Sequence, residues 1–89
     1  MKAVITVTGK DMVGIIADVS ALCVKYNANI VDITQSVLSD YFAMIMLVEI
    51  EKLSIRFSEF VDILTEFGKT KSLAIHTMHE DIFNTMHHI

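Results

Sequence analysis

The chain has 89 residues, which predicts a single domain over residues 1–89. Its net charge is −4 at pH 7, with only seven Lys and Arg residues and no basic run, so it lacks the cationic surface that a nucleic-acid-binding protein needs. Apolar residues make up 53% of the chain, and on so small a domain this surplus favours an oligomeric interface.

Three features bear on the cellular compartment. Cys23 is the single cysteine and cannot form an internal disulfide, which fits a reducing cytosol. The first residues resemble a strand and not a signal peptide. The longest apolar run, residues 41–48, is too short to cross a bilayer. We therefore expect a cytoplasmic protein that does not engage a membrane.

The first third of the chain predicts a strand followed by a helix. Residues 2–8 alternate and are rich in β-branched side chains, and this strand stops at Gly9. Asp11 is expected to cap the helix that follows, and Asn27 to end it, because Asn tolerates the left-handed conformation. The apolar stripe of this helix comprises Met12, Ile15, Ile16, Val19, Leu22, Cys23 and Tyr26.

A hairpin, a second helix and a last strand follow. Residues 30–38 and 41–51 read as two strands joined by a tight turn at Ser39-Asp40. Residues 42–50 are apolar on both faces, which predicts a central strand with its second face also covered, for example by a partner subunit. In the second helix, Ser54 is the expected N-cap and Gly68 the C′ glycine.

Residues 71–78 are expected to form a short last strand, and residues 80–88 a helical tail. The order β-α-β-β-α-β with right-handed crossovers predicts an α+β, ferredoxin-like fold. This fold is a four-stranded antiparallel sheet with two helices on one face, here followed by the short C-terminal helical tail.

The turn between the first strand and the first helix is the best candidate for chemistry. It carries two glycines five residues apart, and unpaired amides at a helix N-terminus suit a carboxylate or a phosphate. Gly9 is expected to permit a turn that a Cβ would block, and Gly14 to let the helix start approach the strand or a ligand. Tight strand–helix turns also need glycine for structural reasons alone, so the pattern by itself leaves both interpretations open.

These residues resemble the opening of an ACT domain, which has a G-x-D-x-x-G-I/V/L turn, a helix and then N-x-N-I. The matching positions are Gly9, Asp11, Gly14, Ile15, Asn27, Asn29 and Ile30. The resemblance covers essentially the whole chain. Its ending, residues 75–89, is similar to small stand-alone bacterial ACT proteins and to the ACT halves of glycine-cleavage repressor-like proteins and formyltetrahydrofolate deformylases.

The resemblance implies a regulatory, non-catalytic module without a cofactor. It implies a homodimer, or a higher oligomer, that binds an amino acid or a related metabolite at this turn, near the subunit interface. Any regulated enzyme or regulator would be a separate chain. The backbone of residues 10–15 would hold the ligand, Asp11 would accept an ammonium or cap the helix, and Asn29 would reach across the interface. The implied ligand-binding residues are Gly9, Lys10, Asp11, Met12, Val13, Gly14, Ile15, Asn29 and Ile30.

Other reactive side chains favour structural roles. The histidines gather near the C-terminus beside Glu80 and Asp81, a pattern more typical of a surface tail than of a metal site. They are His76, His79, His87 and His88. Cys23 lies on the apolar stripe and is expected in the core. No nucleophile–base pair can be assigned to a common pocket.

Methionines on the expected strands leave a second hypothesis open. Met44, Met46 and Met78 favour sheet core or dimer packing. The alternative to a ligand-binding module is a protein-interaction module that regulates a partner through its sheet edge or a Met-rich face, without a small ligand.

Overall fold

The structure is a computed structural model that describes residues 1–10 and 13–86. Its elements follow in the order β1 (Lys2–Gly9), α1 (Ile15–Lys25), β2 (Asn29–Leu38), β3 (Tyr41–Glu49), α2 (Phe57–Thr70), β4 (Ala74–His79) and α3 (Glu80–Met86). The predicted ferredoxin-like α+β fold is confirmed, and the strand limits differ from the expected ones by at most three residues.

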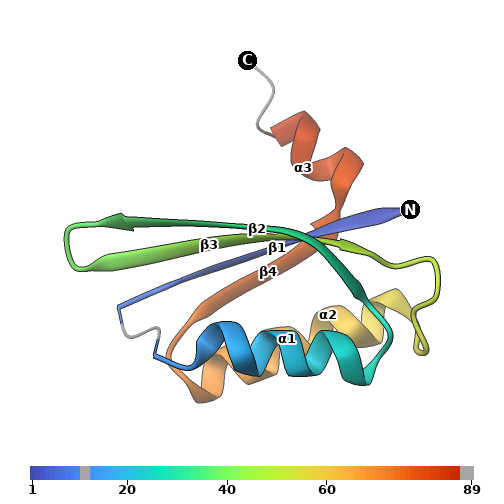
Figure 1. Cartoon of the computed structure of the whole chain (residues 1–89), viewed down its shortest axis with the longest axis horizontal. Helices are drawn as coiled ribbons and strands as arrows, with labels where there is room; N and C mark the ends of the chain where they lie inside the picture. The colour runs from blue at the N-terminus through green and yellow to red at the C-terminus, as the bar shows by residue number, and fades with distance from the viewer. Residues whose placement is uncertain (11–12, 87–89) are drawn as a thin grey trace.

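The four strands form one antiparallel sheet in the order β2-β3-β1-β4. The predicted central position of β3 is therefore correct. Its side chains alternate, so Met44 and Met46 face the same side as their β1 partners Val7 and Ile5. Helices α1 and α2 cover this side (Figure 1).

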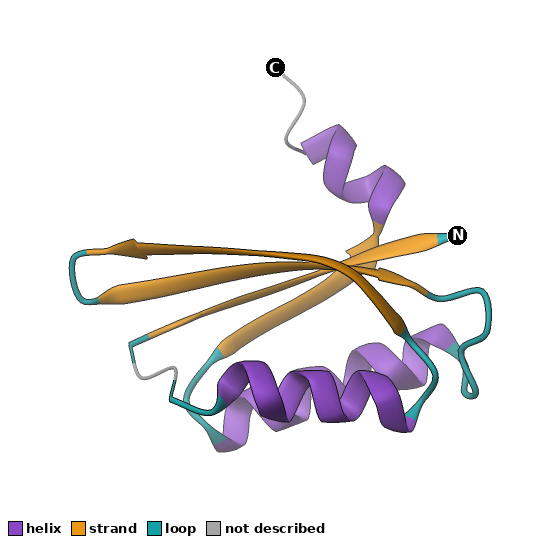
Figure 2. Cartoon of the chain, in the orientation of Figure 1, coloured by secondary structure: helices purple, strands orange, loops and turns teal. Residues whose placement is uncertain are grey.

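The helical tail lies on the other face of the sheet, a position that the periodicity of the sequence did not reveal. Figure 2 shows α3 on the side opposite to α1 and α2. It contacts both β1 and β4. Val4 points to this side of β1 and is only 3% exposed. The sheet is thus covered on both faces near β4.

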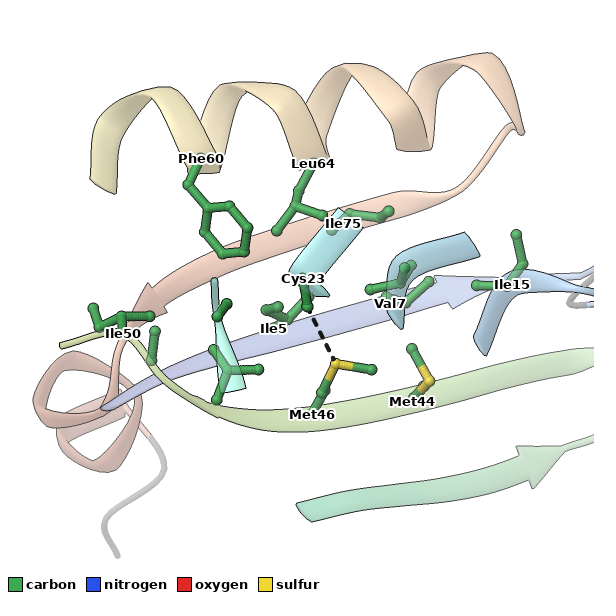
Figure 3. Packing of buried hydrophobic residues seen from close by; sticks show 14 of the residues in the cluster. Ile5, Val7, Ile15, Cys23, Met44, Met46, Ile50, Phe60, Leu64 and Ile75 are labelled. Atoms are coloured by element: carbon green, nitrogen blue, oxygen red, sulfur yellow. Dashed lines mark hydrogen bonds between the residues drawn. The ribbon is translucent and has the colours of Figure 1, made fainter. Parts of the chain in front are cut away.

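The core lies between the sheet and the two long helices (Figure 3). Phe60 and Leu64 of α2 are fully buried over the sheet. From α1 the buried residues are Ile15, Val19 and Cys23, which are three of the seven residues of the predicted stripe. The repeat of about 3.6 residues per turn brings these side chains to one side of the helix.

Both long helices end in the same hydrogen-bonded motif. Asn27 is left-handed with φ 63°, and the Ala28 amide donates to the Cys23 carbonyl at 2.8 Å. The prediction that Asn27 ends the first helix is confirmed. In α2 the left-handed residue is Ser72, with φ 57°.

Gly68 is therefore not the C′ residue of α2, and that prediction is wrong. It lies inside the helix and is buried. A Cβ at this position would come within 2.9 Å of the Leu73 carbonyl oxygen and 2.8 Å of Ile75 Cγ1. Close packing of α2 on β4, and not helix termination, requires this glycine.

Both long helices also begin later than expected. Gly14 is the N-cap residue of α1 and Arg56 that of α2, so the predicted cap at Ser54 is wrong. The Ser54 amide instead donates to the carbonyl of Tyr26 at 2.9 Å, which ties the end of α1 to the segment before α2. Asp11 itself lies outside the described residues.

Strand β2 is the longer of the two edge strands. Its pairing with β3 shifts between Ile30 and Asp32, and the residue between them, Val31, is 48% exposed. The tight turn after β2 has Ser39 at φ 57°, as expected for Ser39-Asp40. Within the described residues, no helix is long and apolar enough to cross a membrane.

Candidate functional site

The two glycines of the turn before α1 have different roles. Gly14 has φ 78°, and apart from Gly14 and its two chain neighbours no described atom lies within 4 Å of the position that its Cβ would occupy. Gly9 has no left-handed backbone, but a Cβ there would collide with Cδ2 of Leu73. The backbone conformation therefore requires Gly14 and packing requires Gly9, which reverses the reasons that the sequence predicted.

The start of α1 presents its backbone to the turn. The first amides of a helix have no partner within the helix, and among the described residues no side chain caps this end. The first intrahelical bond runs from the Asp18 amide to the Gly14 carbonyl at 3.0 Å. Ile15 is buried, so only its backbone faces the turn, whereas Val13 is 91% exposed. Of the predicted ligand residues, Asp11 and Met12 lie outside the described range.

Asn29 lies at the opposite end of α1 from the turn. The helix has 11 residues and is therefore about 16 Å long. Asn29 is exposed, whereas the side chain of Ile30 packs against the core. Within one chain the structure thus does not bring Asn29 together with the glycine turn.

Asn29 lines a groove of about 570 Å³ between the end of α1 and the end of β3. The lining residues are Val24, Asn27, Ala28, Asn29, Glu49, Glu51 and Lys52. The Glu49 carboxylate accepts a hydrogen bond from the N-terminal ammonium of Met1 at 2.9 Å and another from the Glu51 amide at 3.1 Å. The bond from the N-terminus lowers the pKa of Glu49, so this carboxylate stays ionised at the groove.

The sequence did not predict that Glu49 and Glu51 line a groove with Asn29. Glu49 is the direct cross-strand partner of Asn29. Alternation showed that the two strands form a hairpin, but the bulge near Val31 changes the register at this end, so counting from the turn does not pair these residues. Two carboxylates at the expected end of a strand were the available signal.

The histidines do not converge within the described residues. His76 pairs with Thr6 and is exposed on the face away from α1 and α2. His79 points to the other face, where its ring stacks on Phe57 with the ring centres 4.2 Å apart. No group of three metal-binding side chains occurs in residues 1–10 and 13–86, and His87 and His88 lie outside this range.

Cys23, Met44 and Met46 belong to the core, as predicted. Burial raises the pKa of the Cys23 thiol to about 11, and its Sγ donates to Met46 Sδ at 3.9 Å (Figure 3). Met44 and Met46 are fully buried, whereas Met78 is half-buried on the face that carries α3. The buried pair contributes no methionine surface for a partner protein.

Comparisons with known proteins agree with this architecture. A family model described as "ACT domain" matches residues 2–77. A UPF0237 protein of Clostridium perfringens is 48% identical over 89 residues, which is all of both chains. The solved structure of an ACT domain protein from Streptococcus pneumoniae has a TM-score of 0.81 and 38% identity and covers 93% of each chain.

A formyltetrahydrofolate deformylase from Pseudomonas syringae shares the fold. Its TM-score is 0.77 at 21% identity, and the match covers 88% of this chain but only 27% of that one. The likeness to these enzymes that the sequence suggested is thus limited to one domain of them.

Proposed function

Because this chain belongs to the ACT domain family, we propose that it is a regulatory module that binds a small molecule as a homodimer. The ligand is an amino acid or a related metabolite, held between the turn at Gly14 and a neighbouring subunit. The observation that carries the proposal is the left-handed Gly14 at the start of α1, beside which the described residues other than its chain neighbours leave open space. A helix N-terminus attracts a carboxylate, because its first amides have no partner within the helix and the helix dipole is positive there.

The two ends of α1 have complementary chemistry. The start of α1 offers amides and the positive end of the helix dipole, whereas the groove at Asn29 carries Glu49 and Glu51. An amino acid presents a carboxylate to the first and an ammonium to the second. One chain cannot offer both to a single small ligand, because α1 separates them by about 16 Å.

A symmetric dimer through β2 resolves this separation. Helix α1 contacts β2 and α2 contacts β4, so α1 lies nearer to the β2 edge of the sheet. If two copies pair antiparallel through β2, their α1 helices run side by side in opposite directions. The turn at Gly14 of each copy would then lie beside Asn29 of the other. Such a dimer has two equivalent sites.

The first test is isothermal titration of the protein against the twenty amino acids. At least one should give saturable heat with the wild type, and Gly14→Val should abolish it, because a β-branched residue is strained at φ 78° and fills the open space. Circular dichroism should show that the variant is folded. Equal heats for wild type and variant would reject the turn as the site.

A second test asks whether two chains share the site. Gly14→Val and Asn29→Ala homodimers should each fail to bind. When the two variants are mixed and allowed to exchange subunits, each heterodimer contains one site with both wild-type residues. Binding should return with about half of the wild-type stoichiometry in that heterodimer. If mixing restores no amino-acid binding although mass spectrometry shows that subunits have exchanged, the shared-site mechanism is wrong.

A second candidate function is a protein-interaction module that uses the edge of β2 and binds no small ligand. The observation in its favour is the exposed edge of β2, which contains neither Lys nor Pro and exposes Val31 and Val37. An extended segment of a partner can add to such an edge. Recovery of one specific enzyme in a pull-down, together with silent amino-acid titrations, would favour this function over the first.

We further propose that the protein binds and does not catalyse, and that it works in the reducing cytosol. Cys23 is buried with a raised pKa and is unsuited to act as a nucleophile. His76 and His79 point to opposite faces of the sheet, so they cannot act on the same group. Loss of a measured hydrolase activity on His76→Ala would contradict this view.

A further inference from the structure

A second groove, of about 460 Å³, lies at the end of the sheet where β1 ends and β3 and β4 begin. Its walls include Thr8, Lys10, Tyr41, Lys71, Ser72 and Ala74. The strand register directs Thr8, Tyr41 and Ala74 to the face of the sheet away from α1 and α2. The groove shares Gly9 and Lys10 with the proposed amino-acid site, but the rest of its lining is separate, and one chain forms it alone.

The charged lining residues of this groove are positive, whereas the chain as a whole is negative. The net charge of the chain is −4, yet two lysines line the groove and none of its described lining residues is acidic. The groove at Asn29 combines Glu49 and Glu51 with Lys52, and a third groove combines Glu80 and Asp81 with Lys2 and the N-terminus at Met1. Among the described lining residues, the groove of Lys10 and Lys71, called the lysine groove below, has charges of positive sign alone, so it attracts an anion more strongly than the other two.

The two lysines are available to a ligand. Among the described residues Lys71 forms no ion pair, whereas the neighbouring Lys69 is paired with Glu66 at 3.2 Å. The ammonium of Lys10 lies 5.5 Å from the ring centre of Tyr41, a contact that holds it at the groove. Thr8 and Ser72 add hydroxyl groups to the lining.

We infer that this groove binds the phosphate group of a small soluble molecule. Lysine ammonium groups act as point charges that suit a tetrahedral phosphate, whereas planar bidentate recognition of a carboxylate favours arginine. The hydroxyl groups of Thr8 and Ser72 can donate to the remaining phosphate oxygens. The volume exceeds that of phosphate alone and leaves room for an organic portion beside Tyr41.

Titration with inorganic phosphate and with pyrophosphate tests this inference. Two-dimensional NMR of the ¹⁵N-labelled protein should show saturable shifts of the backbone amides of Thr8, Ser72 and Ala74. Lys71→Gln should weaken pyrophosphate binding about tenfold, the effect of losing one charge-assisted contact. Lys10→Gln should have a similar effect.

Lys25→Gln is the matched control. Lys25 also holds its ammonium over a tyrosine ring, 5.4 Å from the centre of Tyr26, but it lies outside the groove. This variant should bind pyrophosphate like the wild type. An equal loss in Lys25→Gln and Lys71→Gln would reveal unspecific charge attraction and overturn the inference, as would the absence of saturable shifts up to about 10 mM pyrophosphate.

The inference and the proposed function can fail separately. Lys71 belongs only to the groove and Gly14 only to the turn. Gly14→Val should therefore leave pyrophosphate binding intact, and Lys71→Gln should leave amino-acid binding intact. Loss of phosphate binding in Gly14→Val would assign both ligands to one site and overturn the separate groove.

Discussion

At the scale of single residues, Gly14 is held by its backbone and not by its surroundings. Its φ of 78° disfavours any side chain with a Cβ, although the described residues beyond its chain neighbours leave space beside it. We expect Gly14→Ala to lower the free energy of unfolding by about 1–2 kcal/mol. Gly14→Asn should cost less, because Asn tolerates the left-handed conformation. Urea denaturation measures both, and equal losses would contradict the conformational explanation.

At Gly9, the stability cost of a side chain should instead depend on the neighbouring Leu73. Gly9→Ala should destabilise the fold because the new Cβ meets Cδ2 of Leu73. In a Leu73→Val background this carbon is missing, so the same substitution should cost less. The coupling in this double-mutant cycle should be at least about 0.5 kcal/mol. Additive losses would show that the collision does not govern the site.

The buried thiol of Cys23 makes stability depend on alkaline pH. Its pKa is raised to about 11 in the folded chain, whereas an unfolded thiol ionises near pH 8.5. Between these values the unfolded state loses a proton that the folded state keeps, so stability contributed by the thiol is present below about pH 8.5 and is lost as the pH rises toward 11.

Thermal unfolding of wild type and Cys23→Val from pH 7 to pH 10.5 tests this linkage. The wild type should lose more stability over this range than the variant, which lacks the titrating group. Parallel curves for the two proteins would mean that the thiol does not contribute to the alkaline loss.

At the scale of elements, the contact between α2 and β4 outweighs helix propensity. Alanine is a better helix former than glycine by about 1 kcal/mol, so replacing an exposed helical glycine with alanine stabilises the helix. Gly68 is buried against Leu73 and Ile75, and Gly68→Ala should instead destabilise by about 1–3 kcal/mol. Guanidinium denaturation measures whether Gly68→Ala raises or lowers the free energy of unfolding.

Asp62→Ala serves as the matched control for Gly68→Ala. Asp62 lies in the same helix but is exposed, so this change should be neutral or slightly stabilising. If Gly68→Ala were also stabilising, α2 would not pack on β4 as closely as the structure indicates.

At the scale of the whole molecule, the edge strand β2 decides the assembly that we propose. Light scattering should show a dimer at micromolar concentration. Thr34 is exposed near the middle of β2, so Thr34→Lys would place two lysines close together across the symmetry axis. This variant should remain folded but become monomeric, and it should lose amino-acid binding.

Ser54→Lys adds the same charge at an exposed position between β3 and α2 and should leave the dimer intact. A wild-type monomer would contradict the proposed assembly. A dimer that survives Thr34→Lys would place the interface elsewhere, for example on the open face of β3, where Ile45 is 40% exposed.

The order of elements, the central position of β3 and much of the core could be predicted from the amino-acid sequence. Alternation and helical periodicity are local properties, so residues such as Met46 and Cys23 could be assigned to the core without knowing their neighbours. The resemblance in the Gly9–Ile30 segment also identified the family correctly. The left-handed conformation of Asn27 was predictable because Asn tolerates this conformation at the end of a helix.

Features that depend on contacts between distant segments could not be predicted and are seen only in the folded chain. The reasons for Gly9 and Gly68 involve Leu73, and the groove at Asn29 involves a register changed by a bulge. The face that α3 covers follows from packing and not from its own pattern. The lysine groove joins residues more than sixty positions apart in the chain, from Lys10 to Lys71. Strand pairing brings such residues together, and no local pattern records which strands pair or in which register.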